Sequence, residues 1–403
     1  MGKELFDEVI DRRGTYCTQW DYIEDRFGVN DLLPFTISDM DFKVPDKISE
    51  ALKKRNAHPI YGYTRWNHND FKVPIVNWYN QRFQTIIELN WIVYSPSVMY
   101  TISKLIELKS TVGDQVVIQT PAYDAFFKTI KSNKREVVEN KLRYEDGRYS
   151  IDFKDLEKKL AHPKAKILVL CSPHNPTGRV WTKSELLKIV DLCNRYDVFL
   201  ISDEIHMDIV REGHHHTPIV VITEELKNIA ICTSTSKTFN TSGLIGSYAL
   251  IPDMELQKVF LDILKNRDGL SSASILGIES MMAGYKYCHE WVDELNVYVS
   301  ENMHFTFDYL KQNIPEIKFI IPESTFLAWL DISELSFKMK EIQQALIAIG
   351  AVAIMDGSIY GEEGQDFLRM NLGCSKEKVL DGLERLKKAI DYLKQGQLGN
   401  GLN

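Results

Sequence analysis

The sequence predicts an α/β protein in which a mostly parallel sheet is sandwiched by helices and is joined to a smaller α+β domain. Between about residues 90 and 255, short apolar runs rich in β-branched residues alternate with segments of helical periodicity. These runs lack the apolar–polar alternation of a half-exposed strand, which indicates strands covered on both faces. After about residue 310, strand and helix patterns are mixed, as is typical of an α+β domain.

The expected strands of the large sheet lie in chain order at Ile92–Tyr94, Gln115–Gln119, Ile167–Cys171, Val198–Ser202, Ile229–Thr233 and Ser247–Ile251. Helical patterns separate several of them, for example at Met99–Ser110 and Lys183–Arg195. In open parallel sheets the ligand crevice lies beyond the carboxyl ends of the strands. Residues directly after these runs are therefore the first candidates for a functional site.

The C-terminal part combines expected strands with expected helices. The strands are Lys318–Ile321, Phe326–Leu330, Val352–Met355 and Phe367–Asn371, and the helices span about residues 337–349 and 375–394. The stretch from about 255 to 310 is helix-rich and is expected to link this smaller domain to the large sheet.

Composition narrows the classes of function. The 403 residues carry a formal net charge of −8, which argues against a broad surface for nucleic acid or for an acidic membrane. The longest apolar run, Ala345–Met355, has 11 residues, whereas a membrane span needs about 20. The six cysteines are scattered without a CxxC motif, and the first residues lack the apolar region of a secretory signal. We therefore expect a cytoplasmic protein with reduced thiols.

Lys237 is the first candidate for chemistry. It stands in the string TSTSKTFN, directly after the apolar run at residues 229–233. By itself it also fits an ordinary loop lysine in water. Its functional interpretation is an amine that attacks a carbonyl to form a Schiff base, because burial near other cations lowers the pKa of a lysine.

Asp203 and Asn175 follow two other expected strands. Asp203 is compatible with a helix cap, but beside a Schiff-base lysine it also has the chemistry to hold a pyridine nitrogen protonated. Asn175 lies in a turn-like NPTG string, and its amide has the chemistry to donate a hydrogen bond to a ring oxygen.

The strings NPTG, SDEIH and TSTSKTFN place Asn175, Asp203 and Lys237 at spacings of 28 and 34 residues. This combination resembles fold-type I pyridoxal-phosphate enzymes of the class I/II aminotransferase superfamily. The strings CTQWDY, DLLPFTISDMDF, GYTRW, TPAYDAF, RDGLSS and YGEEG narrow the resemblance to MalY/PatB-type cystathionine β-lyases, or C–S lyases, over about residues 6–390. The resemblance implies a homodimer whose subunit has a large cofactor domain, residues 45–290, and a small domain, residues 1–44 plus 291–403.

The resemblance also implies roles for individual residues. Lys237 would bind pyridoxal 5'-phosphate covalently, Asp203 would pair with the pyridine nitrogen, and Asn175 would donate to the ring oxygen. The remaining cofactor contacts would be Tyr123 stacked on the ring, the backbone N–H groups of Ser97, Val98 and Met99 and the hydroxyl of Ser234 on the phosphate, and Tyr63 reaching the phosphate from the neighbouring subunit.

Arg369 matches the residue that grips the α-carboxylate of the amino-acid substrate, which Tyr123 also faces. A guanidinium forks onto a carboxylate through two parallel hydrogen bonds. Two positions depart from the aspartate-aminotransferase pattern. His206 stands where those enzymes have a tyrosine beside the ring oxygen, and Ile245 stands where they have a phosphate-binding arginine.

The expected reaction is α,β-elimination of L-cystathionine or a related cysteine S-conjugate to a thiol, pyruvate and ammonia, with Lys237 as the catalytic base. An aminotransferase needs the same lysine, aspartate and arginine and stays a rival, as does a non-enzymatic regulatory binding role on the same fold. Consecutive histidines at 214–216 predict a solvated loop rather than a metal site. No GxGxxG or P-loop string is present, so dinucleotide and nucleoside-triphosphate sites lack their fingerprint.

Overall fold

A computed structural model describes residues 4–400 of the chain and contains two separate main sheets. The larger has seven strands in the order β2 (Ile92–Ser95), β10 (Ser247–Leu250), β9 (Ile229–Thr233), β8 (Phe199–Asp203), β7 (Ala165–Cys171), β3 (Gln115–Thr120) and β4 (Glu136–Lys141). All neighbours pair in parallel except β10, which is antiparallel to both β2 and β9. The predicted mostly parallel sheet is therefore confirmed.

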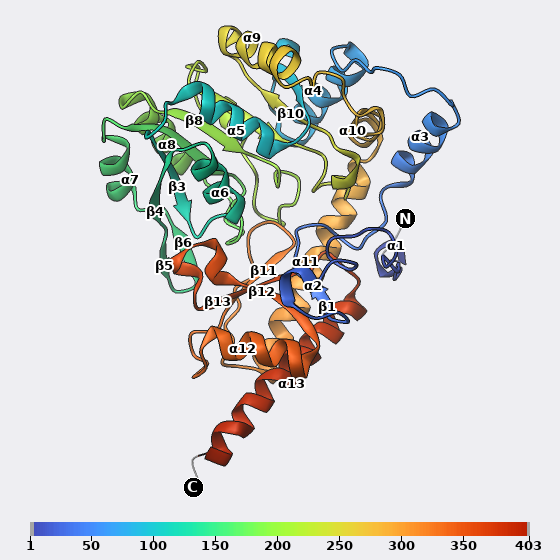
Figure 1. Cartoon of the computed structure of the whole chain (residues 1–403), viewed down its shortest axis with the longest axis vertical. Helices are drawn as coiled ribbons and strands as arrows, with labels where there is room; N and C mark the ends of the chain where they lie inside the picture. Colours follow the sequence, from blue (N-terminus) through green and yellow to red (C-terminus); the bar gives the residue numbers. More distant parts are fainter. Residues whose placement is uncertain (1–3, 401–403) are drawn as a thin grey trace.

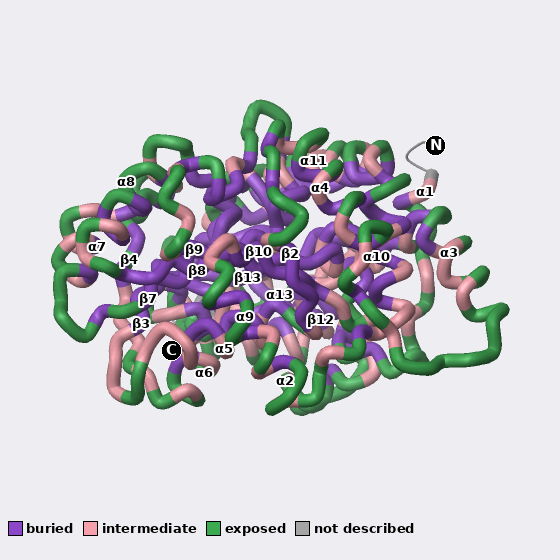
Figure 2. The backbone as a smooth tube through the Cα atoms, turned by 90° about the horizontal axis from the view of Figure 1, so that it is seen from above, coloured by how far each residue is buried: buried purple, intermediate pink, exposed green. Residues whose placement is uncertain are grey.

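Helices cover both faces of this sheet, as Figure 2 shows in a view from above. One layer contains α4 (Asn69–Phe83), α8 (Lys183–Arg195) and α11 (His289–Asn313), and the other contains α5 (Val98–Lys109), α6 (Asp124–Ser132) and α9 (Met254–Asp262). The remaining helices of this half are α3 (Asp46–Asn56), α7 (Phe153–Leu160) and α10 (Ile275–Tyr287). Strands β7, β8 and β9 are almost entirely buried between these layers, which explains their unbroken apolar character.

The smaller sheet has the order β1 (Leu33–Phe35), β12 (Val352–Asp356), β13 (Phe367–Asn371) and β11 (Leu327–Asp331). It lies below the large sheet in Figure 1, next to α12 (Met339–Ala345) and α13 (Lys376–Asn400). The short helices α1 (Glu4–Asp7) and α2 (Glu24–Phe27) precede β1 in the chain. Strands β5 (Arg143–Glu145) and β6 (Arg148–Ser150) form a separate antiparallel hairpin. The N-terminal segment thus pairs with the C-terminal one, because β1 runs parallel to β12.

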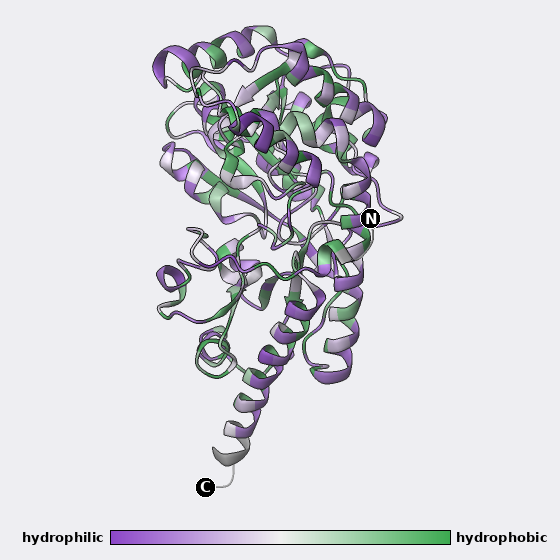
Figure 3. Cartoon of the chain, turned by 90° about the vertical axis from the view of Figure 1, so that its right-hand side faces the viewer, coloured by the Kyte–Doolittle hydropathy of each residue, from purple (hydrophilic) through white to green (hydrophobic). Residues whose placement is uncertain are grey.

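Apolar strands form the interior of both halves, and the outward faces of the helices are mainly hydrophilic, as Figure 3 shows. All six cysteines are buried and free, so the expectation of reduced core thiols is confirmed. Within residues 4–400, none of the helices combines the length and the apolar character that a membrane crossing requires.

The strand expected at Lys318–Ile321 is wrong. Lys318 makes only an isolated bridge to Asp331, and the residues after it have no strand partner. Phe319 is buried while Ile320 is 54% exposed. This alternation of buried and exposed side chains is typical of a strand, although the backbone here has no strand partner. Four strands of the structure were not predicted from the sequence. Strand β1 contains a proline, β4 is a largely polar strand at the edge of the sheet, and β5 and β6 are three-residue, mostly exposed strands of a hairpin.

Candidate active site

A cavity of about 580 Å³ opens where β7, β8 and β9 end, at the carboxyl edge of the large sheet. Ten of the residues singled out from the sequence line it: Ser97, Val98, Met99, Tyr123, Asn175, Asp203, His206, Ser234, Lys237 and Arg369. They come from six separate stretches of the chain. The large sheet brings together all of them except Arg369, because its loops leave from the same edge, and Arg369 is added from β13 of the smaller sheet.

Lys237 lies largely buried in this cavity, and its Nζ donates a hydrogen bond of 2.6 Å to the backbone carbonyl of Ser38. Burial lowers the pKa of its amine to about 8, against the opposing charge of Asp39, and the cationic Arg369 adds to the lowering. An amine with such a pKa is substantially neutral near pH 8 and is therefore nucleophilic. The expected lowering of the lysine pKa by burial near another cation is thus present.

Asp203 is the last residue of β8 and has a buried carboxylate. It accepts a hydrogen bond from the Ile205 N–H at 3.1 Å. Burial raises the pKa of this carboxyl to about 7, although that hydrogen bond and the charge of Lys237 both favour the ionised form. A cationic group in the cavity would therefore lower the cost of keeping Asp203 ionised.

His206 follows one turn later, and its ring lies edge-on to Phe326. Its Nδ1 is buried without a hydrogen-bond partner. Burial, with the positive charges of Lys237 and Arg369 nearby, lowers the pKa of His206 to about 3, so the ring is neutral. A neutral imidazole with an unpaired nitrogen is available to a ligand in the cavity.

Arg369 projects from β13 of the smaller sheet into the same cavity, where it is 3% exposed. It donates to Asn175 Oδ1 at 3.2 Å and to the Thr36 carbonyl at 2.7 Å, and its guanidinium carbon lies 4.7 Å from the centre of the Tyr360 ring. Its Nε is buried and unpaired. The Asn175 oxygen is thus occupied by Arg369, which leaves the amide nitrogen to donate elsewhere.

The phosphate-binding candidates lie at the opposite end of the cavity. Ser97 caps α5 by accepting the Tyr100 N–H, so the helix begins at Val98, and Val98 and Met99 lie in its first turn. Free N–H groups at a helix N-terminus favour an anion. Ser234 also lines this end, but its hydroxyl donates to the Gly246 carbonyl at 2.6 Å. A phosphate contact from Ser234 therefore requires that hydroxyl to turn.

Ile245 stands at the position where the aspartate-aminotransferase pattern has a phosphate-binding arginine. Its φ is +54°, a left-handed conformation that a β-branched residue rarely adopts. Gly277, at the start of α10, lies against it so closely that a Cβ would stand 2.2 Å from the Ile245 carbonyl oxygen. The loop above the cavity is therefore held in a strained shape by close contact with α10.

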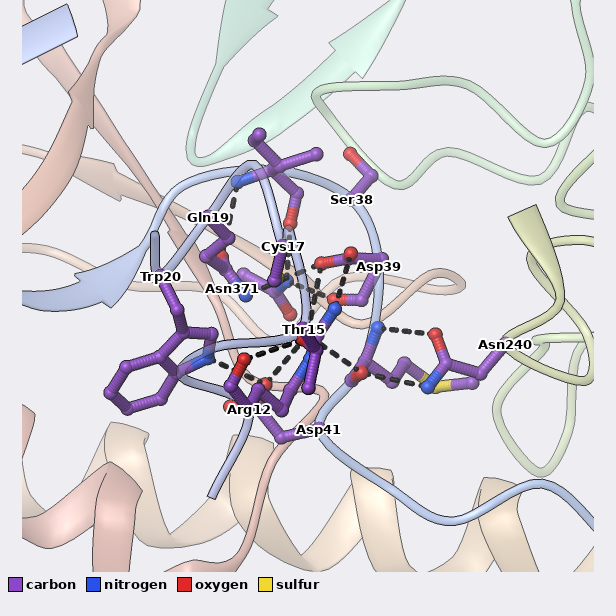
Figure 4. A network of polar contacts seen from close by, with 12 residues as sticks. Arg12, Thr15, Cys17, Gln19, Trp20, Ser38, Asp39, Asp41, Asn240 and Asn371 are labelled. Carbon is purple, nitrogen blue, oxygen red and sulfur yellow. Dashed lines mark hydrogen bonds and ion pairs between the residues drawn. The ribbon is translucent and has the colours of Figure 1, made fainter. Parts of the chain in front are cut away.

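A segment of the N-terminal region, residues 36–42, links both halves of the site (Figure 4). Asn240 donates to two carbonyls of this segment at 2.8 and 2.9 Å, and Asn371 donates to two others at 2.5 and 2.6 Å. Asn240 follows Lys237 by three residues, and Asn371 follows Arg369 by two. The segment therefore connects the lysine loop of one sheet to the arginine strand of the other.

Tyr63 is the one candidate that does not line the cavity. It is fully exposed in the irregular stretch between α3 and α4, at residues 57–67. Figure 1 shows this blue loop projecting away from the body of the subunit. Ile60 and Tyr61 on the same loop are also more than half exposed. Within one chain, Tyr63 has no role in the site.

Sequence reasoning missed several residues that line the cavity. Ser38 and Tyr360 lie inside strings already noted for their resemblance, but neither had been given a role. Arg26 carried no signal, because it stands in a short polar stretch typical of a surface. Only the position of α2 brings it to the cavity.

The prediction of a solvated loop for the three histidines at 214–216 is wrong for the third of them. His214 and His215 are exposed, as a solvated loop requires, but His216 is 6% exposed. Its Nε2 lies 3.0 Å from Oε2 of Glu204, whose other oxygen accepts from Ser202 Oγ. A buried carboxylate needs such partners, so the third histidine turns inward.

The family model for "Aminotransferase class I and II" matches residues 30–386 of the chain. The chain belongs to this family. The match spans both sheets and every candidate residue described above, Tyr63 included.

Two relatives within the aminotransferase class I and II family are similar over almost their whole length. The protein MalY of Escherichia coli (strain K12) is 45% identical over 385 residues, which cover 96% of this chain and 98% of the relative. The cystathionine beta-lyase PatB of Bacillus subtilis (strain 168) is 37% identical over 386 residues, covering 96% and 99%.

Solved structures agree with these sequence relationships. A PLP-bound putative aminotransferase from Clostridium difficile 630 has a TM-score of 0.93 at 36% identity, covering 96% of this chain and 99% of that one. Cystalysin from Treponema denticola, whose crystal structure contains pyridoxal 5'-phosphate, has a TM-score of 0.91 at 34% identity and the same coverage. The fold of this chain is therefore that of the pyridoxal-phosphate members of the family.

Proposed function

We propose that this protein is a pyridoxal-phosphate-dependent C–S lyase that releases a thiol from L-cystathionine or a related cysteine S-conjugate, with pyruvate and ammonia as the other products. Its similarity to a cystathionine beta-lyase and to cystalysin supports this proposal. The observation that carries it is the meeting of Lys237, Asp203 and Arg369 in one cavity.

The residues present fit the cofactor. The pKa of Asp203 is raised by burial despite the nearby charge of Lys237, and a protonated pyridine nitrogen would offer this carboxylate a direct ion-pair partner. The unpaired His206 nitrogen and the free amide nitrogen of Asn175 provide polar groups for ring substituents. The first turn of α5 suits the phosphate, and Tyr123 lines the same cavity.

Substrate orientation depends on Arg369. Its fork-shaped guanidinium would hold the α-carboxylate of the amino acid, which fixes the direction of the Cα–H bond. Lys237, with a pKa near 8, takes that proton at Nζ as general base. Pyridoxal phosphate, when bound, supplies the electron-withdrawing ring that accepts the charge left at Cα.

Elimination then needs no oxidant. The bond between Cβ and sulfur breaks with both electrons going to sulfur, and the thiolate takes up a proton as it leaves. The remaining three-carbon enamine reacts with water to give pyruvate and ammonia. Asp203 stays ionised throughout, because its part is to keep the pyridine nitrogen protonated.

The subunit is proposed to work as a homodimer in which Tyr63 reaches the phosphate of the neighbouring site. Its full exposure, together with that of Ile60 and Tyr61, supports this arrangement, because a surface loop rarely presents three such side chains to water. Sedimentation should give twice the chain mass, and Tyr63→Phe should weaken cofactor binding without changing that mass.

We further propose that residues 45–290 form the large domain and residues 1–44 plus 291–403 the small one. The separation of the two sheets supports this division. The cytoplasm is the proposed compartment, and the six free, buried cysteines support it.

Pyruvate release tests the function. The purified protein with pyridoxal phosphate should form pyruvate from L-cystathionine in the absence of any keto acid, and Lys237→Ala should lose both that release and the absorbance of the bound cofactor. Lys265→Ala, which changes a surface lysine outside the cavity, is the matched control. Strict dependence on an added keto acid would identify an aminotransferase instead, and turnover by Lys237→Ala would overturn the assignment.

A further inference from the structure

A second cavity, of about 780 Å³, adjoins the active site and lies between α6 and the smaller sheet. Two residues, Arg26 and Asp124, line both this cavity and that of the active site. They have opposite charges, and they come from different elements, Arg26 from α2 and Asp124 from the first turn of α6. The region that the two cavities share is therefore lined by one cation and one anion.

Arg26 is available to a ligand. Its Nη1 lies 3.3 Å from Met355 Sδ, and no carboxylate among the described residues forms an ion pair with it. Among the residues that the structure describes, the ion-pair partner of Asp124 is Lys128, at 2.6 Å, and that lysine side chain is 74% exposed. An exposed ion pair of this kind contributes at most about 1 kcal/mol, so an incoming ammonium group is able to displace Lys128.

Both charges also act on two tyrosines that line the active-site cavity. Burial raises the pKa of the Tyr123 and Tyr360 phenols, Asp124 raises both further, and Arg26 lowers both. Arg369 lies over the Tyr360 ring on the inner side. Arg26, Asp124 and the two tyrosines thus line the same cavity as Arg369.

We propose that Arg26 and Asp124 form a subsite for the far end of the substrate, and that this end carries both a carboxylate and an ammonium group. Arg26 would bind the carboxylate and Asp124 the ammonium, while Arg369 holds the α-carboxylate at the inner end. The preferred class is therefore a thioether or disulfide with an amino acid at each end, such as L-cystathionine. This inference rests on the proposed C–S lyase activity.

Four conjugates separate the contributions of the two charges. L-cystathionine carries both distal charges, S-(2-carboxyethyl)-L-cysteine only the carboxylate, S-(2-aminoethyl)-L-cysteine only the ammonium, and S-ethyl-L-cysteine neither. The measurement is kcat/KM for pyruvate release, expressed for each conjugate relative to S-ethyl-L-cysteine. This ratio cancels any effect of a variant on cofactor binding or on the chemical step, because such an effect is the same for all four conjugates.

Arg26→Gln should lower the ratio about tenfold for the two conjugates with a distal carboxylate and should not lower it for the aminoethyl conjugate. Asp124→Asn should do the reverse, lowering it for the two conjugates with a distal ammonium. Arg26→Lys should restore part of the loss. Arg195→Gln, an exposed arginine on α8 that pairs only with Glu157, is the matched control.

The two proposals fail in different ways. If the native protein forms pyruvate from none of the four conjugates, the lyase function itself is wrong. If it forms pyruvate but both variants keep the native ratios, the subsite is wrong while the lyase function stands. An equal loss of kcat/KM on all four conjugates would likewise overturn the subsite. Arg26 would then affect activity by supporting the structure rather than by binding the substrate.

Discussion

The Nζ atom of Lys237 donates a hydrogen bond to the backbone carbonyl of Ser38 across 199 positions of the chain. This bond aims the amine into the cavity between the two sheets and leaves it without a carboxylate ion pair among the described residues. The same N-terminal segment is held by Asn240 and Asn371. The position of the reactive amine therefore depends on both halves of the molecule.

The first prediction concerns the pH dependence of cofactor capture. Only a neutral amine attacks the cofactor aldehyde, and burial lowers the pKa of Lys237 to about 8. The capture rate in cofactor-free protein should therefore rise with pH, reach half its maximum near pH 8, and level off above pH 9. Stopped-flow absorbance measures it, with Lys237→Gln as the control. A rate that still climbs beyond pH 10 would contradict the lowered pKa.

The second prediction concerns Asp203 in the cofactor-free protein. Its pKa is raised from an ordinary value of 3.8 to about 7, so its contribution to stability is full below about pH 4 and is lost as pH rises to about 7. Asp203→Asn imitates the neutral carboxyl, so it should raise the free energy of unfolding at pH 8 by up to about 4 kcal/mol and have much less effect at pH 5.

Urea unfolding at both pH values measures this difference, and Asp191→Asn on the exposed face of α8 is the control. The same Asp203→Asn variant should lose at least about a hundredfold in turnover, because an amide does not keep the pyridine nitrogen protonated. A variant that is both less stable at pH 8 and fully active would refute the assigned role.

The third prediction concerns the fork of Arg369. Arg369→Lys keeps the charge but loses the two parallel hydrogen bonds to a carboxylate, so kcat/KM should fall about a hundredfold, mainly through a higher KM. The absorbance of the bound cofactor should stay close to native. Steady-state kinetics with L-cystathionine measures the change. An unaltered KM would remove Arg369 from substrate binding.

The fourth prediction concerns the contact between Gly277 and Ile245. Gly277→Ala places a Cβ 2.2 Å from the Ile245 carbonyl oxygen, so the loop above the cavity must move. We expect a loss of about 1–3 kcal/mol in stability and weaker cofactor binding. Gly243→Ala lies in the same loop with no atom within 4 Å of its added Cβ and is the control. Equal effects of both substitutions would exclude the close contact as the cause.

The local pattern of apolar residues was sufficient to predict a strand wherever that strand is buried on both faces. The runs at β7, β8 and β9 were recognised because a doubly covered strand must be apolar throughout. Asp203 ends β8, and Asn175 and Lys237 stand four residues after the ends of β7 and β9, so the sheet edge that holds the chemistry was also predictable. The helices that begin with a capping residue, such as Ser97 before α5, agreed to within a residue or two.

Contacts between segments that are distant in the chain could not be predicted from the sequence. Strand β1 is three residues long and contains a proline, and only its pairing with β12 makes it a strand. Lys318–Ile321 shows the converse, a strand-like alternation without a partner. His216 resembles its two exposed neighbours in sequence and differs only because Glu204 lies beneath it.

The sequence by itself determined the α/β class, the mixed strand and helix pattern of the C-terminal part, and the residue types of a Schiff-base site. Each follows from local apolar pattern or from a short string whose chemistry is specific. The tertiary structure alone decided that Ser38 holds the Lys237 amine, that Arg369 occupies the Asn175 oxygen, and that Arg26 and Asp124 line the same cavity. Those pairs lie far apart in the chain, and only packing of the two sheets against each other sets their distances.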